Sequence, residues 1–153
     1  MRLLLASLAL LVVAPDGRGE DGLVAYTVTD GMRIDAPLTG RPGDWRRGRD
    51  IYFDRALTGC SSCHGSPGGP GAEVRAENND APGLSGVASR MSEGEIRLWI
   101  VAPTALDPRT DMPGFYLAGQ RTGAENPIIN GPWLSAVEIE DLVAYLTRQI
   151  ASP

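Results

Sequence analysis

The pentapeptide Cys60-Ser61-Ser62-Cys63-His64 contains both cysteines and the only histidine of this 153-residue chain. The order C-x-x-C-H is typical of covalent attachment of a c-type haem. Two thiols separated by two residues lie on one short turn, where each can add to one vinyl group on the same edge of a porphyrin. The adjacent imidazole is then placed to bind the iron. The pattern predicts one covalent haem c, held by Cys60 and Cys63, with His64 as an axial ligand.

Three other interpretations fit this pentapeptide less well. A structural zinc site is the weakest, because it needs four protein ligands and the chain has no further cysteine or histidine. A thiol-disulfide oxidoreductase using Cys60 and Cys63 would need a preceding strand and a βαβ context, neither of which is visible in the sequence around residue 60. A chance match in an ordinary loop is the third. The dithiol and the chance match stay open as lesser alternatives.

The first residues indicate export. Met1-Arg2 precedes an apolar run from Leu3 to Ala14 that is too short to span a bilayer, and Gly and Pro follow it at once. We expect a signal peptide over residues 1–19, cleaved between about residues 14 and 20. No later segment approaches transmembrane length, and no cysteine near the cleavage region could carry a lipid. The expected protein is periplasmic and has no membrane anchor.

Composition restricts the class of partner and the size of the core. The formal net charge is −5 and there is no basic stretch, which argues against nucleic-acid binding. The chain contains 19 glycines and 12 prolines, and only 6% of its residues are aromatic. Such a chain is rich in loops, and its small apolar core would gain from burying a large flat cofactor. We expect one domain, residues 44–153, preceded by an extended arm over residues 20–43.

Hydrophobic spacing predicts an all-α domain. The arm could add one short strand. A first helix begins after Asp44, which can cap it, and a second begins after Ser92 and ends before Pro103. A third begins after Ser135; the second and third both open with the capping-box order S-x-x-E. The first helix presents Trp45, Gly48, Tyr52 and Ala56 on one face, the second Ile96, Trp99 and Ile100, and the last Ile139, Leu142, Val143, Leu146 and Ile150.

A sixth ligand for the iron must come from the methionines, because the single histidine excludes bis-histidine ligation. Met32 lies in the arm, and Met91 directly precedes the Ser92 cap, where it would staple a helix to the core. Met112 lies in a loop whose flanking prolines fix the backbone, and it is the favoured ligand. A methionine that merely fills a gap under the loop is the alternative. Histidine and methionine together raise the potential and leave no site for oxygen or peroxide, which favours electron transfer. An open sixth position would instead suggest ligand binding or peroxidase chemistry.

The order of these features resembles the class I cytochrome c fold. The resemblance rests on five features in this order: the first helix, the C-x-x-C-H segment, Pro82 to Gly86, Met112-Pro113 and the closing helix. The resemblance implies that the first and last helices cross where Gly48 and Tyr52 meet Leu142 and Tyr145. It also implies that the Pro82 carbonyl accepts a hydrogen bond from Nδ1 of His64 and so fixes the ring. Pro82 is therefore a further expected cofactor-binding residue.

Three longer stretches are similar to the SoxX family, the monohaem subunits of SoxAX thiosulfate-oxidising cytochromes. They are APLTGRPGD (residues 36–44) running into RGR (47–49), TDMPGFY (110–116) and LSAVEIEDLVAYL (134–146). The loop over residues 117–133 fits less closely. Trp45, Trp99 and Trp133 could serve at a partner surface, although Trp99 is expected in the core because its neighbours Ile96 and Ile100 share its helical face.

The SoxX resemblance implies a division of labour. A SoxA-like subunit would supply the catalytic cysteine that couples thiosulfate to a SoxYZ-like carrier, which would touch this chain only transiently. This chain would accept the electrons and pass them to a small acceptor cytochrome, without being catalytic itself. The residues agree at one point: both cysteines are committed to haem, so neither remains for sulfur chemistry. The alternative is a free-standing periplasmic electron shuttle without an obligate partner.

Overall fold

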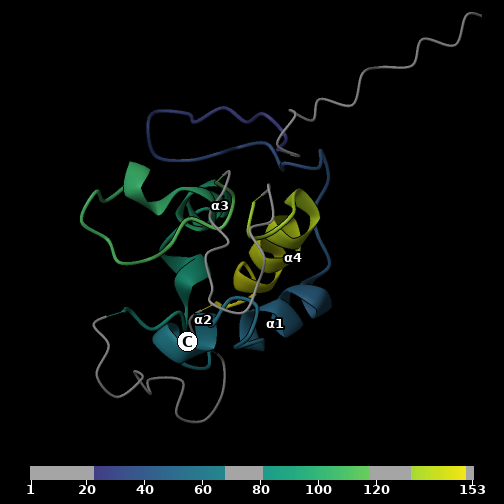
Figure 1. Ribbon diagram of the computed structural model, residues 1–153, viewed down its shortest axis with the longest axis vertical. Helices are drawn as coiled ribbons and strands as arrows, with labels where there is room; N and C mark the ends of the chain where they lie inside the picture. The colour runs from purple at the N-terminus through teal and green to yellow at the C-terminus, as the bar shows by residue number, and fades with distance from the viewer. Residues whose placement is uncertain (1–22, 68–80, 118–131, 151–153) are drawn as a thin grey trace, which may run out of the picture.

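Helices form every regular element in the part of the chain that the computed structural model describes, which is residues 23–67, 81–117 and 132–150. The expected signal peptide over residues 1–19, most of the loop after His64 and part of the loop before Trp133 lie outside these residues. Within them no strand forms, and in place of the strand considered for the arm there are only isolated bridge residues, Val24 and the pair Thr29 and Arg33. The expected all-α class is confirmed (Figure 1). The elements are α1 (Trp45–Phe53), α2 (Cys60–His64), the 3₁₀ helix η1 (Val87–Ser89), α3 (Glu93–Val101), the 3₁₀ helix η2 (Pro103–Ala105) and α4 (Ala136–Leu146).

Helices α1 and α4 meet in direct backbone contact at Gly48. A Cβ atom at this position would lie 1.8 Å from the carbonyl oxygen of Asp141, so only glycine allows the two backbones to approach so closely. Beside this contact the rings of Tyr52 and Tyr145 pack with their centroids 5.4 Å apart. The contact expected between the first and last helices is therefore present, and it fixes the element that leads into α2.

The helix starts follow the expected capping residues. Ser92 and Ser135 each accept a hydrogen bond from the backbone of the third helical residue, and the glutamate at that residue bonds back, so both capping boxes form. Asp44 caps α1 by accepting from the amide of Arg46 at 2.8 Å. Each cap satisfies amides that the first helical turn leaves without partners.

Two helices are shorter than their hydrophobic spacing predicted. Helix α1 ends at Phe53 because the Asp54 carboxylate accepts from the amides of Ala56 and Leu57, at 2.9 and 3.0 Å, and folds the chain into a turn. Ala56 is consequently exposed rather than on the buried face. Helix α4 ends at Leu146, and Ile150, predicted on its apolar stripe, is 70% exposed.

Helix α3 is buried on most of its surface, but the side chains that it buries are not all the expected ones. Arg97 is completely buried, whereas Trp99, which was expected in the core, is only half-buried and shares its face with Glu95. The Arg97 guanidinium donates to both carboxylate oxygens of Glu140 in α4, at 2.9 and 3.0 Å, and to the carbonyl of Ile34 in the arm, at 2.6 Å. A buried charge needs such partners. This ion pair joins the arm, α3 and α4.

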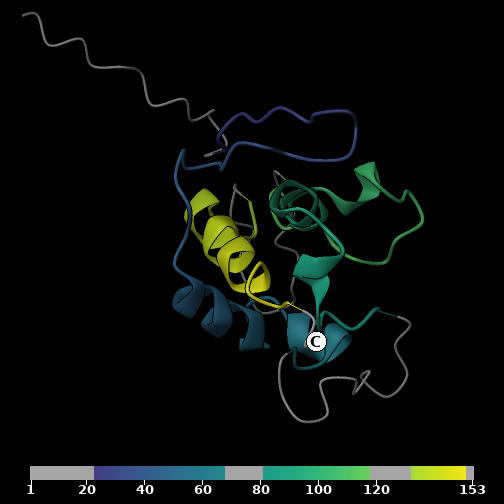
Figure 2. The ribbon, with the colours of Figure 1, turned by 180° about the vertical axis from the view of Figure 1, so that it is seen from behind.

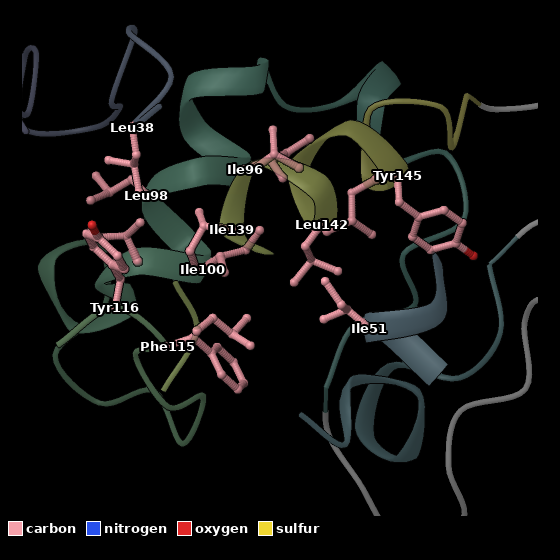
Figure 3. Packing of buried hydrophobic residues seen from close by; sticks show 14 of the residues in the cluster. Leu38, Ile51, Ile96, Leu98, Ile100, Phe115, Tyr116, Ile139, Leu142 and Tyr145 are labelled. Atoms are coloured by element: carbon pink, nitrogen blue, oxygen red, sulfur yellow. The ribbon is translucent and has the colours of Figure 1, made fainter. Parts of the chain in front are cut away.

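One apolar core lies between α1, α3 and α4. Figure 3 shows side chains from these helices and from Phe115 and Tyr116 converging on one interior, with Ile139 and Leu142 of α4 near its centre. The arm closes one end of this core with Ile34 and Leu38. The buried apolar residues are Ile34, Leu38, Ile51, Tyr52, Val87, Ile96, Leu98, Ile100, Val101, Phe115, Tyr116, Leu134, Ile139, Leu142, Val143, Tyr145 and Leu146.

Among the described residues, no helix has both the length and the apolar character needed to cross a bilayer.

Candidate haem site

The five residues of the C-x-x-C-H pattern form helix α2, a single short turn that follows directly on the turn after α1 (Figure 1). The hydroxyl of Thr58 donates to the carbonyl of Ile51 at 2.7 Å and ties this turn back to α1. Trp133, at the far end of the chain, donates its indole N–H to the carbonyl of Leu57 at 2.6 Å. The backbone that enters α2 is therefore held from both sides.

The two cysteines of α2 are free thiols in different surroundings. Cys60 is half-buried and packs against the core, while Cys63 is exposed. Burial raises the pKa of the Cys60 thiol. Redox-active dithiols depend on a thiol whose pKa is lowered, so this environment does not favour thiol-disulfide exchange. Two thiols on one turn, one packed against the core and one exposed, suit a tethering role better.

The imidazole of His64 is oriented by a backbone carbonyl. Nδ1 of His64 lies 2.8 Å from the carbonyl oxygen of Pro82, the contact that the family resemblance implied. Because a carbonyl only accepts, Nδ1 must carry the proton in this hydrogen bond, and Nε2 keeps its lone pair. The ring is thus held in the tautomer that a metal ligand requires.

Tyr52 fixes the chain on the other side of His64. Its ring is fully buried in α1, and its hydroxyl donates to the carbonyl of Gly65, the residue after His64, at 2.8 Å. Burial raises the pKa of the Tyr52 phenol, so it stays protonated and remains a donor. Sequence reasoning placed Tyr52 at the helix crossing but missed this bond, because nothing local in the sequence indicates a partner thirteen residues away.

The three candidate methionines occupy distinct environments. Met112 is half-buried against the core. Its backbone amide donates a hydrogen bond to the Thr110 hydroxyl at 3.2 Å. The loop that follows Met112 is anchored where the Phe115 amide donates to the Ile100 carbonyl at 2.9 Å.

Met91 is also half-buried against the core, just before the start of α3, as expected for a helix staple. Met32 is 53% exposed on the arm. The tip of the arm and α2 lie at opposite ends of the molecule in both views (Figures 1 and 2).

These residues fit a covalently held haem. Two free thiols share one turn, the neighbouring imidazole has a free Nε2, and an anchored loop offers a thioether. Sulfur and imidazole ligands of this kind hold haem iron in electron-transfer proteins. Among the described residues no group of three or more cysteine, histidine or acidic side chains is placed to bind a bare metal ion, so nothing there favours the zinc interpretation.

Comparison with known families identifies the chain. The family model described as "Cytochrome c" matches residues 46–149, about two thirds of the chain. The chain belongs to the cytochrome c family. The predicted cofactor class follows, since family members carry covalently bound haem c and transfer electrons, and Cys60 and Cys63 are the two cysteines available for attachment.

This cytochrome c is similar to a chain of a known complex. The crystal structure of SoxXA from P. pantotrophus contains a chain that is 28% identical, with a TM-score of 0.65, over 82% of this chain and 94% of that chain. The cytochrome is therefore SoxX-like, as its sequence indicated, and the class I cytochrome c fold is confirmed. A search of curated proteins found no significant match.

Proposed function

We propose that this cytochrome c is the electron-carrying subunit of a periplasmic SoxAX-type complex. A SoxA-like subunit would couple thiosulfate to a SoxYZ-like carrier, and this chain would accept the electrons and pass them to a small acceptor cytochrome. The likeness to a chain of SoxXA, which extends over 94% of that chain, is the observation that carries the proposal. The expected signal peptide over residues 1–19 supports a periplasmic location.

The residues of the haem site have separate roles in this proposal. Cys60 and Cys63 form the two thioether bonds, and Nε2 of His64 ligates the iron while the Pro82 carbonyl holds Nδ1. Met112 supplies the sixth ligand from its anchored loop. The single haem supplies a one-electron couple, which suits transfer between a catalytic partner and a carrier. With both axial positions filled by this chain, no coordination site remains for a substrate.

Catalysis is assigned to the partner because this chain has no thiol left to act as a nucleophile once both cysteines hold the haem. Both of its cysteines are used for attachment, and thiosulfate coupling requires a cysteine nucleophile. A non-catalytic role follows for this chain within an enzyme complex. It also follows that the isolated chain should carry electrons but not react with thiosulfate.

The test measures haem reduction by absorption spectroscopy after thiosulfate is added. We expect reduction when this chain, the SoxA-like subunit and the carrier protein are all present, and none when the SoxA-like subunit is omitted. The matched control is a SoxA-like subunit whose catalytic cysteine is replaced by serine. Equal reduction without that subunit would instead support a free-standing electron shuttle. A chain that loses its colour on denaturation and whose thiols can be alkylated would support the dithiol alternative.

A further inference from the structure

The arm folds back on itself in a tight turn at its tip. Asp30 and Gly31 both have positive φ, 51° and 70°, and the Met32 amide donates to the Thr29 carbonyl at 3.0 Å. Two positive φ values in succession are typical of the turns that close β-hairpins. Beyond the turn, Thr29 and Arg33 form one bridge, and no further bridge joins the two limbs in the described part of the chain. Figure 1 shows the two limbs as the purple and blue loop at the end of the molecule farthest from α2.

Four consecutive residues of the first limb, Ala25 to Val28, leave their backbone unpaired. No hydrogen bond joins their amides or carbonyls to any described residue. The residues on either side are anchored: the Val24 amide donates to the Tyr116 hydroxyl and the Thr29 amide to the Arg33 carbonyl, both at 2.7 Å. The limb is thus held at both ends while its middle offers free donors and acceptors, as an exposed sheet edge does.

The same limb exposes apolar side chains, of which Tyr26 also packs on one side against Tyr116, with ring centroids 6.4 Å apart. Five large hydrophobic residues are exposed in the described part of the chain, and three of them, Tyr26, Val28 and Met32, lie within seven residues of the arm. Tyr26 and Val28 alternate along the limb, as side chains do on one face of a strand. The limb also borders a groove of about 260 Å³ that extends to the second limb at Ile34 to Leu38. Clustered exposed apolar surface of this kind marks a site of interaction.

The surroundings of the arm tip are acidic. Asp30, Asp35 and Glu93 have side chains that are 68%, 56% and 51% exposed. Arg33 pairs with both aspartates, at 2.8 and 2.9 Å, and Glu93 pairs with the buried Arg97, so three acidic groups face two arginines, one of which is shared with Glu140. A second copy of this chain would bring the same acidic groups to the contact and be repelled. A different chain with a basic side chain beside apolar residues would complement the surface.

We propose that residues 25–28 accept an extended segment of the partner subunit as an added β-strand. The main-chain groups of Ala25 to Val28 would pair with the incoming strand, Tyr26 and Val28 would contact its apolar side chains, and the acidic tip would receive a basic residue. The inference rests on the proposed function, since it locates the contact with the SoxA-like subunit. Because the tip of the arm lies at the end of the molecule away from α2 (Figure 2), this strand would anchor the partner without being the route by which the electron reaches the haem.

Amide hydrogen exchange tests the pairing directly. The haem-loaded, isotope-labelled full chain is measured by NMR alone and in complex with the SoxA-like subunit. In the free protein the amides of residues 25–28 should exchange without protection. In the complex, two alternate amides of the four should be protected at least tenfold, because a paired strand directs alternate amides to its neighbour. Protection already present in the free chain, or protection of none of the four in a complex that does form, would overturn the inference.

Proline variants test the same contact by affinity. Thr27→Pro and Val28→Pro each remove one amide donor, on opposite sides of the limb, and neither amide has a partner among the described residues. At least one of them should weaken binding of the SoxA-like subunit tenfold or more. Thr27→Ala and Val28→Ala keep the amides, so each should bind at least several-fold more tightly than the corresponding proline variant. Unchanged haem spectra and melting temperatures establish that the variants are folded.

The remaining outcomes separate this inference from the proposed function. If the wild-type chain forms no complex with the SoxA-like subunit, the proposed function fails and the inference falls with it. If the complex forms and both proline variants bind as tightly as their alanine controls, only the inference fails. Self-association of the free chain through residues 25–28 would make a second copy the occupant and overturn the choice of partner.

Discussion

At the scale of single residues, the haem segment is held by groups that lie outside it. The Pro82 carbonyl holds the His64 ring, and the Tyr52 hydroxyl holds the next residue, Gly65. The His64 imidazole is therefore positioned by groups on two sides of it. Each of these contacts can be removed separately.

Replacing Tyr52 with phenylalanine should loosen this segment without disturbing the core. The ring stays in place, but the Gly65 carbonyl loses its donor, for a loss of about 1 kcal/mol in the free energy of unfolding. Urea denaturation of the haem-loaded protein measures this loss. Tyr145→Phe is the control, because it removes a hydroxyl from the adjoining ring of the same cluster and no hydrogen bond of that hydroxyl is seen among the described residues. Equal losses in both variants would contradict a specific role for the Tyr52 hydroxyl.

Replacing His64 with alanine should prevent accumulation of stable haem-loaded protein, because the haem would be tethered but lack its first axial ligand. The absorption spectrum of the purified protein measures this. Pro82→Ala serves as the control, since the carbonyl that bonds to Nδ1 belongs to the backbone and is retained. A normal low-spin spectrum in the His64→Ala protein would rule out His64 as the ligand.

Replacing Met112 with alanine should abolish the ferric charge-transfer band of a methionine ligand and lower the reduction potential, because loss of the thioether removes its preference for ferrous iron. Spectroelectrochemistry follows both quantities. Met91→Ala and Met32→Ala are the comparison variants, one at a half-buried and one at an exposed methionine. If the band persists in Met112→Ala and disappears in one of the others, that other methionine is the ligand.

At the scale of helices, the junction of α1 and α4 has no room for a side chain. Gly48→Ala would place a Cβ 1.8 Å from the Asp141 carbonyl oxygen and force the helices apart. We expect a loss of roughly 1–3 kcal/mol or more, as for other overpacked interiors, measured by urea denaturation of the haem-loaded protein. Asp50→Ala, on the exposed side of the same helix, is the control and should change stability little. A Gly48→Ala protein as stable as the control would show that the helices separate freely.

Local sequence predicted where helices begin better than where they end. The two capping boxes and the Asp44 cap lie within four residues of the amides they serve, so short patterns are enough to find them. The end of α1 depended on Asp54, whose side chain stabilises a competing turn. Arg97 was missed for the opposite reason: its partner Glu140 is 43 residues away, and a charged residue in a helix is normally read as exposed.

At the scale of the whole molecule, the arm is part of the folded domain as well as a candidate docking surface. Ile34 and Leu38 are buried in the core, and the Leu38 amide donates to Glu140 at 2.9 Å. Composition indicated an extended segment here, but only the folded structure reveals its anchors, because they come from α3 and α4. The haem site shows the same division. Cys60, Cys63 and His64 lie in one short pattern that can be recognised in the sequence, whereas the Tyr52 hydroxyl that holds the chain beside them comes from outside that pattern.

Deleting residues 23–43 should therefore destabilise the haem-loaded domain. Burial of Ile34 and Leu38 would be lost, at about 1.5–3 kcal/mol for each side chain. Arg97 would also lose the Ile34 carbonyl. Deleting only residues 23–32 keeps these contacts and should cost much less. Urea denaturation midpoints of the two deletions provide the comparison, and equal midpoints would show that the second limb contributes nothing to stability.

The junction of α1 and α4 also sets an order of events in biogenesis. The Asp44 amide donates to the Asp141 carboxylate at 2.6 Å, and these residues are 97 positions apart in the chain. During synthesis, residues 60–64 therefore emerge long before the helix that completes their support. The contact between α1 and α4 can form only after nearly the whole domain has been synthesised, so closure of this junction is a late step of folding.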